Sequence, residues 1–316
     1  MKVVVTGATG HMGRYVVHEL VRAGFEVAAG SRSGASVEAP YGSAVRPAAR
    51  NFAVDISSES AVAALAAELN EGSALVHLAA WHPPATGATG PSERSALLET
   101  NVHGTLRALE AASGRASAVV YASTFEVYGV PEGEGAVTEN ARLNPITDYG
   151  ATKLSGEDHL MAFAYEKRTR VVALRLPAIY GPGEVTARAL PNFLRQVARG
   201  ERPTIQGDGA DLRDQLHARD AARAVVSALR STASGIYNIA DGNAHSIAEL
   251  AREALTVSGL GGEPSFAPRV KARYDFHMNC DKARAELGFS AQISLRDGMR
   301  EELEWLRSSG ATVRAH

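Results

Sequence analysis

Short apolar runs alternate along the first half of the chain with longer stretches in which apolar residues recur at helical spacing. The runs that we expect to be strands span residues 3–6, 26–29, 52–55, 74–78, 118–121 and 171–174. The stretches that we expect to be helices span residues 15–21, 59–69, 92–112 and 149–166. Uninterrupted apolar runs are typical of strands buried on both faces of a parallel sheet. The alternation therefore predicts an α/β fold with a doubly wound parallel sheet, which binds ligands outside the carboxyl ends of its strands.

A glycine-rich segment follows the first apolar run and leads into the first predicted helix. Its glycines are Gly7, Gly10 and Gly13. Between a strand and a helix, such glycines permit a tight turn, let phosphates approach the backbone and let the helix pack close to the strand. A pyrophosphate would then bind at the helix N-terminus. The segment therefore predicts a dinucleotide-binding Rossmann domain.

Beyond residue 174 the alternation becomes irregular. Prolines separate shorter elements, and helical spacing returns at residues 220–229, 246–255 and 295–305. We expect residues 1–174, joined by part of 212–240, to form the dinucleotide-binding domain. Residues 175–316 should form mainly a smaller C-terminal lobe that binds the substrate.

Composition places the chain among globular proteins, with 45% apolar and 22% charged residues. A net charge of −2 gives no electrostatic reason to expect binding to nucleic acid or to an anionic membrane. The single cysteine, Cys280, excludes an intrachain disulfide framework, and no ligand spacing fits a zinc site, so we expect no metal. The first residues lack the features of a signal peptide, and no run approaches about 18 apolar residues. We therefore expect a cytoplasmic protein.

Tyr149 and Lys153 lie four residues apart in a predicted helix, which places their side chains on one face. A free tyrosine has a pKa of about 10 and is a poor base at neutral pH. An ammonium group within about 4 to 6 Å stabilises the phenolate and lowers that pKa. The pair is therefore a candidate for proton transfer, although the spacing alone also fits an exposed helix face.

Further motifs follow in an order that resembles one family, the extended short-chain dehydrogenase/reductases of the NAD(P)-dependent epimerase/dehydratase type, which act mostly on sugar nucleotides. The motifs are residues 6–13, 55–56, 77–80, 101–105, 123–124, 127–129, 149–153, 180–183, 213–214 with His217 and Asp220, 238–240 and 287–289. The resemblance spans nearly the whole chain, and it implies the Rossmann fold and an NAD(P)-dependent enzyme.

The resemblance also implies the roles of three residues. Tyr149 would be the acid/base at a substrate hydroxyl, and Lys153 would bind the nicotinamide ribose and lower the pKa of the tyrosine. Thr124 would hydrogen-bond the reacting oxygen, although a hydroxyl at a strand end also satisfies backbone groups. Base and nicotinamide must converge on one carbinol, because a proton leaves its oxygen as a hydride leaves its carbon.

Residues of the glycine turn, the strand ends and the catalytic helix are expected to contact the dinucleotide. They are Gly7, Thr9, Gly10, His11, Met12, Gly13, Ser31, Arg32, Asp55, Ile56, Leu78, Ala79, Ala80, Asn101, Tyr149, Lys153 and Pro177. Asp55 would accept from the adenine amine, or cap the helix that follows, and Asn101 would be a backbone clamp. Where NAD enzymes usually place an acidic residue, this chain has Arg32, which can pair with a 2′-phosphate. The cofactor is therefore NAD(P), with NADP favoured over NAD.

The expected substrate contacts include departures from the family pattern. They are Trp81, Thr124, Phe125, Glu126, Ala178, Arg213 and Arg269. Phe125 replaces the aspartic acid that releases water in 4,6-dehydratases, so dehydration is not expected. Ala178 replaces an asparagine that contacts the substrate diphosphate, whereas Arg213 matches the diphosphate-binding arginine or pairs with a neighbouring aspartate. In relatives the loop that begins at Trp81, here residues 81–87, borders the substrate space, where Trp81 and His82 would either stack on a sugar or nicotinamide or simply pack.

The leading hypothesis is a sugar-nucleotide epimerase that passes a hydride to and from nicotinamide through a keto sugar. An alternative with the same residues is an NADPH-dependent ketoreductase of a deoxysugar nucleotide or another carbonyl compound. A third is a non-catalytic NADP-binding regulator, which the presence of Thr124, Tyr149 and Lys153 disfavours. The resemblance also implies a homodimer, formed by the helices near residues 92–112 and 149–165.

Overall fold

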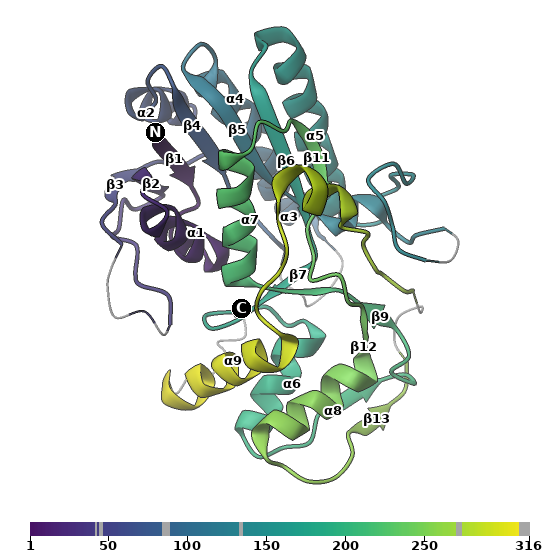
Figure 1. Cartoon of the computed structure of the whole chain (residues 1–316). Coiled ribbons are helices and arrows are strands. Elements are labelled where there is room, and N and C mark those ends of the chain that lie inside the picture. Colours follow the sequence, from purple (N-terminus) through teal and green to yellow (C-terminus); the bar gives the residue numbers. More distant parts are fainter. Residues whose placement is uncertain (42, 44–46, 84–88, 133–134, 270–273, 310–316) are drawn as a thin grey trace.

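The computed structural model describes residues 1–41, 43, 47–83, 89–132, 135–269 and 274–309. A seven-stranded sheet forms its centre, and all neighbouring strands in it are parallel (Figure 1). In spatial order the strands are β11 (Gly235–Asn238), β6 (Arg170–Leu176), β5 (Ala116–Thr124), β4 (Ser73–His77), β1 (Lys2–Thr6), β2 (Glu26–Ser31) and β3 (Arg50–Ala53). The predicted doubly wound parallel sheet is therefore confirmed. β11 was not among the predicted strands, because its four residues include Gly235 and Asn238.

Helices cover both faces of the sheet (Figure 1). One face packs against α1 (His11–Arg22) and α7 (Ala218–Arg230), and the other packs against α2 (Ser60–Glu68), α4 (Gly104–Ala112) and α5 (Asp148–Lys167). In β1, Val3 and Val5 face the first layer and Val4 faces the second, and all three are fully buried. Each such side chain contributes about 1.5 to 3 kcal/mol. Burial on both faces explains why the strands read as continuous apolar runs.

The helix predicted over residues 92–112 is interrupted. It consists of α3 (Pro91–Leu97), the π-helical turn η1 (Leu98–His103) and α4. Asn101, in the π turn, is buried and points its amide at the segment after β4 and at α5. π turns occur mostly as single insertions within helices, often at functional sites.

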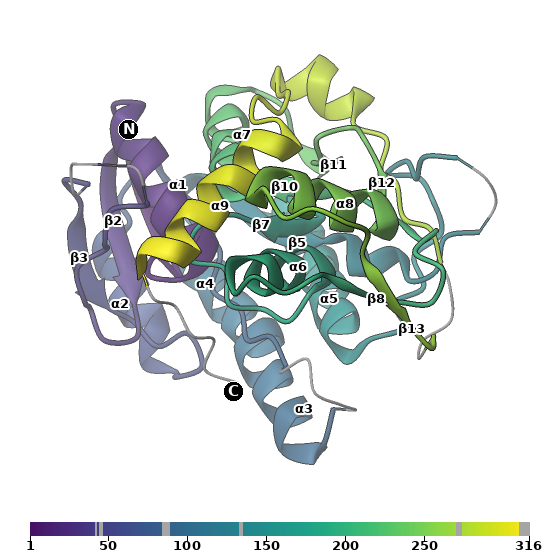
Figure 2. The same cartoon turned by 90° about the horizontal axis from the view of Figure 1, so that it is seen from below.

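The C-terminal part of the chain adds a helical layer next to the carboxyl ends of the strands (Figure 2). It contains α6 (Ala189–Ala198), α8 (Ile247–Ser258) and α9 (Leu295–Ser309), which share a separate apolar core. Three strand pairs accompany it: β7 (Ala178–Tyr180) with β10 (Gln215–His217), β9 (Leu212–Arg213) with β12 (His245–Ser246), and β8 (Thr204–Gln206) with β13 (Ser265–Ala267). The remaining turns are η2 (Phe125–Tyr128) and η3 (Ala283–Leu287).

Candidate functional site

A pocket lies where the strand order reverses, at the carboxyl ends of β1, β4, β5 and β6. The residues that line it are Gly7, Gly10, His11, Met12, Gly13, Leu78, Ala80, Ala122, Ser123, Thr124, Tyr149, Lys153, Leu176, Pro177, Ile179, Glu184, Thr186 and Arg188. The three predicted catalytic residues and most of the predicted cofactor residues are therefore brought together here. A crevice at such a reversal is where doubly wound sheets bind dinucleotides.

The glycine turn forms a cradle in which Gly7 and Gly13 leave no room for a side chain. Gly7 has φ +70°, a conformation that favours glycine. A Cβ added to Gly13 would lie 2.1 Å from the carbonyl oxygen of Gly7, and one added to Gly10 would lie 3.3 Å from the same atom. The free backbone N–H groups of the first turn of α1 begin next to these glycines. The turn therefore fits the pyrophosphate of a dinucleotide.

Tyr149 and Lys153 stand in the first two turns of α5, and both line the pocket. The helix begins there because the Thr147 side chain accepts a hydrogen bond of 2.9 Å from the backbone N–H of Gly150. Thr124 is the last residue of β5, and its buried hydroxyl accepts from the N–H of Glu126 at 3.3 Å. A strand end and a helix start thus hold the three side chains around one space.

The expectation that Lys153 lowers the pKa of Tyr149 is wrong for this structure. The Nζ of Lys153 lies 4.0 Å from the centre of the Tyr121 ring. Burial lowers the pKa of Lys153 to about 7, although Glu157 acts in the opposite direction. The lysine is therefore only partly charged at neutral pH. The pKa of Tyr149 is well above its usual range, because burial and the charge of Glu126 disfavour the phenolate.

Three polar residues from separate segments adjoin Tyr149. The His82 ring centre lies 4.5 Å from the Tyr149 ring centre. Glu126 accepts a hydrogen bond from the Thr147 hydroxyl at 2.8 Å and pairs with Arg188 at 3.4 Å. Sequence analysis named Glu126 as an expected substrate contact but missed Arg188, which lies after residues 180–183 in a segment without a motif.

His11 and Glu184 connect the glycine turn to the segment before α6. The His11 Nδ1 lies 3.0 Å from a Glu184 carboxylate oxygen, and the Nε2 lies 3.1 Å from the Gly181 carbonyl oxygen. Burial opposes ionisation of Glu184, but hydrogen bonds and charge from His11, with further bonds from Thr186, lower its pKa to about 2. Glu184 and Thr186 are pocket residues that the sequence did not reveal. The only available signal was their position after Tyr180-Gly181-Pro182-Gly183.

Other predicted cofactor residues lie outside the pocket lining. Asn101 holds the backbone of Trp81 on both sides, accepting from its N–H at 2.7 Å and donating to its carbonyl at 3.0 Å. Asp55 accepts from the Ser57 N–H at 3.0 Å and hydroxyl at 2.7 Å just before α2. Its carboxylate is exposed, and these bonds lower its pKa. The remaining residues of this group are Thr9, Ser31, Arg32, Ile56 and Ala79.

Most predicted substrate residues are engaged in packing or ion pairs. Phe125 packs on Phe276 with ring centres 4.6 Å apart, and Ala178 pairs with Gln215 in β7 and β10. Trp81 is partly buried, and residues 84–87 of its loop lie outside the described residues.

The two predicted substrate arginines meet at Asp211, in the C-terminal layer. Arg269 donates to the Asp211 carboxylate at 2.9 Å and to Asp208 at 2.5 Å. Arg213 lies 3.8 Å from the Asp211 carboxylate and donates to the Tyr274 carbonyl at 2.5 Å. Asp211 is thus a shared partner of the two cations that the sequence placed in the substrate site.

Two negative findings apply to the described part of the chain. It contains no group of three or more His, Cys, Asp or Glu residues placed to hold a metal ion. Within the same residues, every helix is too short or too polar to cross a membrane.

Comparisons with known proteins agree with this geometry. Residues 3–240 match the model of the NAD dependent epimerase/dehydratase family. A dTDP-glucose 4,6-dehydratase of Streptomyces niveus is 31% identical over 327 residues, which cover 98% of this chain and 94% of that protein. The UDP-glucose 4-epimerase of Thermotoga maritima, solved with UDP-glucose, has a TM-score of 0.84 at 26% identity and covers 98% of this chain and 100% of that one. MoeE5, solved with UDP-glucose and NAD, has a TM-score of 0.82 at 31% identity with the same coverage, and it was also solved with UDP-glucuronic acid and NAD.

Proposed function

Because the chain belongs to the NAD dependent epimerase/dehydratase family, we propose that it is a nucleotide-sugar epimerase with Tyr149 as its acid/base. The observation that carries this proposal is the convergence of Thr124, Tyr149 and Lys153 with the glycine turn around one pocket. A proton acceptor for a sugar hydroxyl and a dinucleotide cradle must share one space for this reaction. Family membership itself makes the chain an NAD(P)-dependent enzyme.

In this proposal the chain moves a proton and orients two ligands. When bound, the nicotinamide supplies hydride acceptance and return. Tyr149 takes the proton of the reacting hydroxyl and later returns it, Thr124 hydrogen-bonds the same oxygen, and Lys153 binds the nicotinamide ribose. Epimerisation additionally requires that the keto sugar turn within the site, so that it would take the hydride back on the opposite face of the same carbon while Tyr149 returns the proton to its oxygen.

Phe125 supports epimerisation rather than 4,6-dehydration, despite the dehydratases among the relatives. Dehydration needs an acid to release water, and a phenyl ring holds no proton for that purpose. The ring is also occupied by its contact with Phe276. The NADPH-dependent ketoreductase remains the second candidate, supported by Arg32.

The fate of the dinucleotide separates these two candidates. An epimerase regenerates its cofactor, so we expect bound dinucleotide at about one per chain in freshly purified protein and turnover without added cofactor. UDP-glucose, UDP-glucuronic acid and dTDP-glucose are the first substrates to test, because relatives are named for them or hold them. Stoichiometric consumption of NADPH would replace the epimerase with the ketoreductase. Tyr149→Phe should lower kcat by about 10²- to 10⁴-fold.

The choice between NAD and NADP depends on the end of β2. Arg32 is exposed there, and Ser31 is buried with a hydroxyl that has no hydrogen-bond partner among the described residues. A guanidinium and a free hydroxyl together support a 2′-phosphate, whereas the NAD held by MoeE5 supports NAD. Arg32→Ala should weaken binding of NADP and leave binding of NAD unchanged, as measured by calorimetry.

Arg213 and Arg269 remain our proposed contacts for the substrate diphosphate. Both guanidinium groups are only partly buried, at 22% and 29% exposure. Their shared partner, Asp211, keeps two cations close together in a position where a diphosphate would compete with it. Arg213→Met should therefore raise KM for a nucleotide sugar more than it changes kcat.

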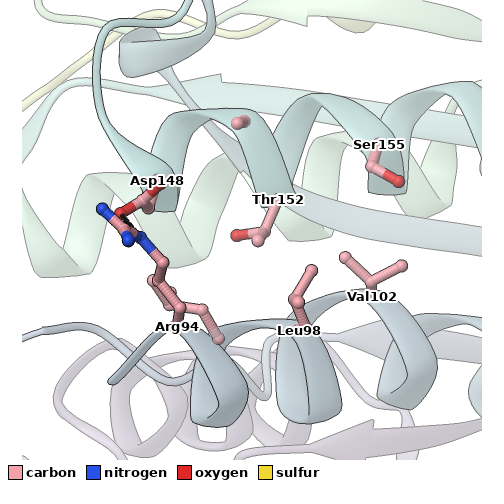
Figure 3. A pocket seen from close by; sticks show the side chains of 8 residues that line it. Arg94, Leu98, Val102, Asp148, Thr152 and Ser155 are labelled. Carbon is pink, nitrogen blue, oxygen red and sulfur yellow. Dashed lines mark hydrogen bonds and ion pairs between the residues drawn. The ribbon is translucent and has the colours of Figure 1, made fainter. Parts of the chain in front are cut away.

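A second, mostly apolar pocket supports a homodimer. It lies between α3–η1 and α5, with Leu98 and Val102 facing Thr152 and Ser155 (Figure 3). Large hydrophobic side chains are exposed on η1 and α5, namely Leu98, Met161 and Tyr165, and Leu106 is exposed on α4, which follows η1. Exposed apolar patches of this kind mark interaction sites. Leu98→Lys should yield a monomer in light scattering, whereas Phe266→Lys, at an exposed site on β13, should not change the mass.

A further inference from the structure

One polar cluster beside Tyr149 has no part in the proposed proton transfer or dinucleotide binding. It consists of His82 after β4, Glu126 in η2 and Arg188 before α6. Arg188 lies 3.4 Å from the Nε2 of His82 and 3.4 Å from a carboxylate oxygen of Glu126. The cluster therefore joins three separate segments around the first turn of α5.

The backbone that leads into His82, an exposed residue, is held at its neighbour in sequence, Trp81. Asn101 bonds both backbone groups of Trp81, and its amide donates to the hydroxyl of Thr152 at 3.1 Å. Thr152 lies on α5, the helix that carries Tyr149. The residue before His82 is therefore tied to the catalytic helix through Asn101. The centre of the His82 ring lies 4.5 Å from the centre of the Tyr149 ring.

Hydrogen bonding assigns the tautomer of His82. Its Nδ1 lies 2.8 Å from the Pro83 carbonyl oxygen, which can only accept, so Nδ1 carries a proton. Burial and then Arg188 lower the pKa of His82, with smaller opposing effects from Pro83, Glu126 and Glu184. The neutral ring therefore presents the Nε2 lone pair to the guanidinium of Arg188, which can only donate.

Arg188 is the cation of this cluster that acts on Tyr149. It lines the pocket together with the tyrosine, and its side chain is 31% exposed. Its charge favours the phenolate, against the effects of burial and of Glu126. A partly exposed arginine with a single long ion pair would be free to turn toward solvent. The Nε2 of His82, which accepts from the Arg188 guanidinium, is a second contact that holds the arginine in place.

We propose that His82 is a positioning residue for proton transfer, which packs on Tyr149 and holds the Arg188 guanidinium beside it through Nε2. The inference rests on the proposed function, in which Tyr149 exchanges the substrate proton. Loss of the Nε2 acceptor releases Arg188 and leaves the phenolate with less positive charge nearby. Tyr149 then becomes a weaker acid, and the fraction of molecules ready to accept a proton falls at neutral pH.

His82→Phe tests this step, because it keeps an aromatic ring and removes the acceptor. The pH profile of kcat is measured on the wild-type and variant holoenzymes. We expect its acid limb to move to higher pH and kcat at pH 7 to fall about three- to tenfold, since one pKa unit corresponds to tenfold. KM should change less than about twofold. The acid limb reports the charged and titratable groups around Tyr149 together, namely His82, Glu126 and Arg188 beside it and Lys153 and Glu184 elsewhere in the pocket lining.

A double-mutant cycle identifies the route of the effect. Arg188→Gln should shift the limb in the same direction, and His82→Phe should add little in that background. His18→Phe, on α1, is the matched control and should leave the profile unchanged. The proposal would be overturned by fully additive shifts of the two variants or by an acid limb that does not move. It would also be overturned by a change confined to KM, which would make His82 and Arg188 substrate contacts.

Wild-type activity decides the proposed function separately. If the wild-type protein turns over nucleotide sugars and His82→Phe matches it, only the positioning role is overturned. If the wild-type protein turns over none of them, the double-mutant cycle is repeated with the free energy of unfolding in urea, measured on the dinucleotide-bound protein. Measurable coupling between His82 and Arg188 would then support the contact between them, and its absence would overturn it.

Discussion

Glu157 on α5 and Arg175 on β6 form an ion pair in which each side chain is only 1% exposed. Arg175 donates from Nε to one carboxylate oxygen at 3.0 Å and from Nη2 to the other at 2.6 Å. The carboxylate also accepts from Ser123, and Arg175 donates to the Tyr128 hydroxyl at 2.8 Å. The pair therefore ties the catalytic helix to two central strands at the floor of the site.

Arg175→Met should lower the free energy of unfolding by about 3 to 5 kcal/mol, because it leaves a buried carboxylate without its cation. Urea unfolding followed by circular dichroism measures the loss. Adding Glu157→Leu should recover part of it, since the double variant buries no unpaired charge. Arg199→Met, which breaks an exposed pair with Glu201, should cost less than about 1 kcal/mol. Equal losses in the two single variants would contradict this account.

Gly13→Ala should abolish dinucleotide binding while the chain still folds. The added Cβ would lie 2.1 Å from the Gly7 carbonyl oxygen, so the turn must open and lose its phosphate cradle. Calorimetric titration with NAD and NADP measures binding, and circular dichroism measures folding. Gly261→Ala is the control, because a Cβ there meets nothing within 4 Å. Unchanged affinity in Gly13→Ala would show that the phosphates bind elsewhere.

The fold was predictable because its strands are buried on both sides. Val3, Val4 and Val5 can all be buried only in a central strand with helices on both faces of the sheet. The apolar run therefore predicted both the strand and its central position in the sheet. The edge strand β11 and the π turn at Asn101 carry no such signal. β11 has a short sequence with a glycine, and the π turn depends on a contact with a distant part of the chain.

The site was predictable where local backbone geometry restricts residue type, and less so where contacts are long-range. The glycine turn and the Tyr149 to Lys153 spacing each lie within one segment. Arg188 reaches the site from a separate segment, and no local pattern marks it. The electrostatic environment of Tyr149 was predicted wrongly for the same reason, because burial and the charge of Glu126, which comes from another segment, raise the pKa of the tyrosine.

Glu126→Gln should move the acid limb of kcat to lower pH, opposite to the shift expected for His82→Phe. Burial and then Glu126 raise the pKa of Tyr149, so removing the carboxylate charge lowers it. The amide still accepts from the Thr147 hydroxyl, which preserves the start of α5. The rate below the limb should rise about two- to fivefold, corresponding to a fraction of one pKa unit. Glu132→Gln, at an exposed site, is the control, and a limb that moves upward would contradict the role of Glu126.

Glu302→Gln should stabilise the protein at pH 8 and leave its stability nearly unchanged at about pH 4. Glu302 is fully buried on α9 and accepts from the Gly181 N–H at 2.8 Å, and burial raises its pKa from 4.5 to about 8. Above pH 4.5 the unfolded chain releases this proton and the folded chain keeps it, so stability falls as the pH rises toward 8. The amide cannot ionise, which removes that loss and should add roughly 2 to 4 kcal/mol at pH 8.

Urea unfolding at several pH values between about 4 and 8 measures the effect of Glu302→Gln on the free energy of unfolding. Glu304→Gln is the matched control, because Glu304 lies on the same helix with an exposed side chain. Its dependence on pH should follow that of the wild-type protein. Parallel curves for wild type and Glu302→Gln would mean that Glu302 ionises normally in the folded chain. Diverging curves would show that ionisation of Glu302, at the contact between α9 and the Gly181 turn, contributes to the loss of stability as the pH rises.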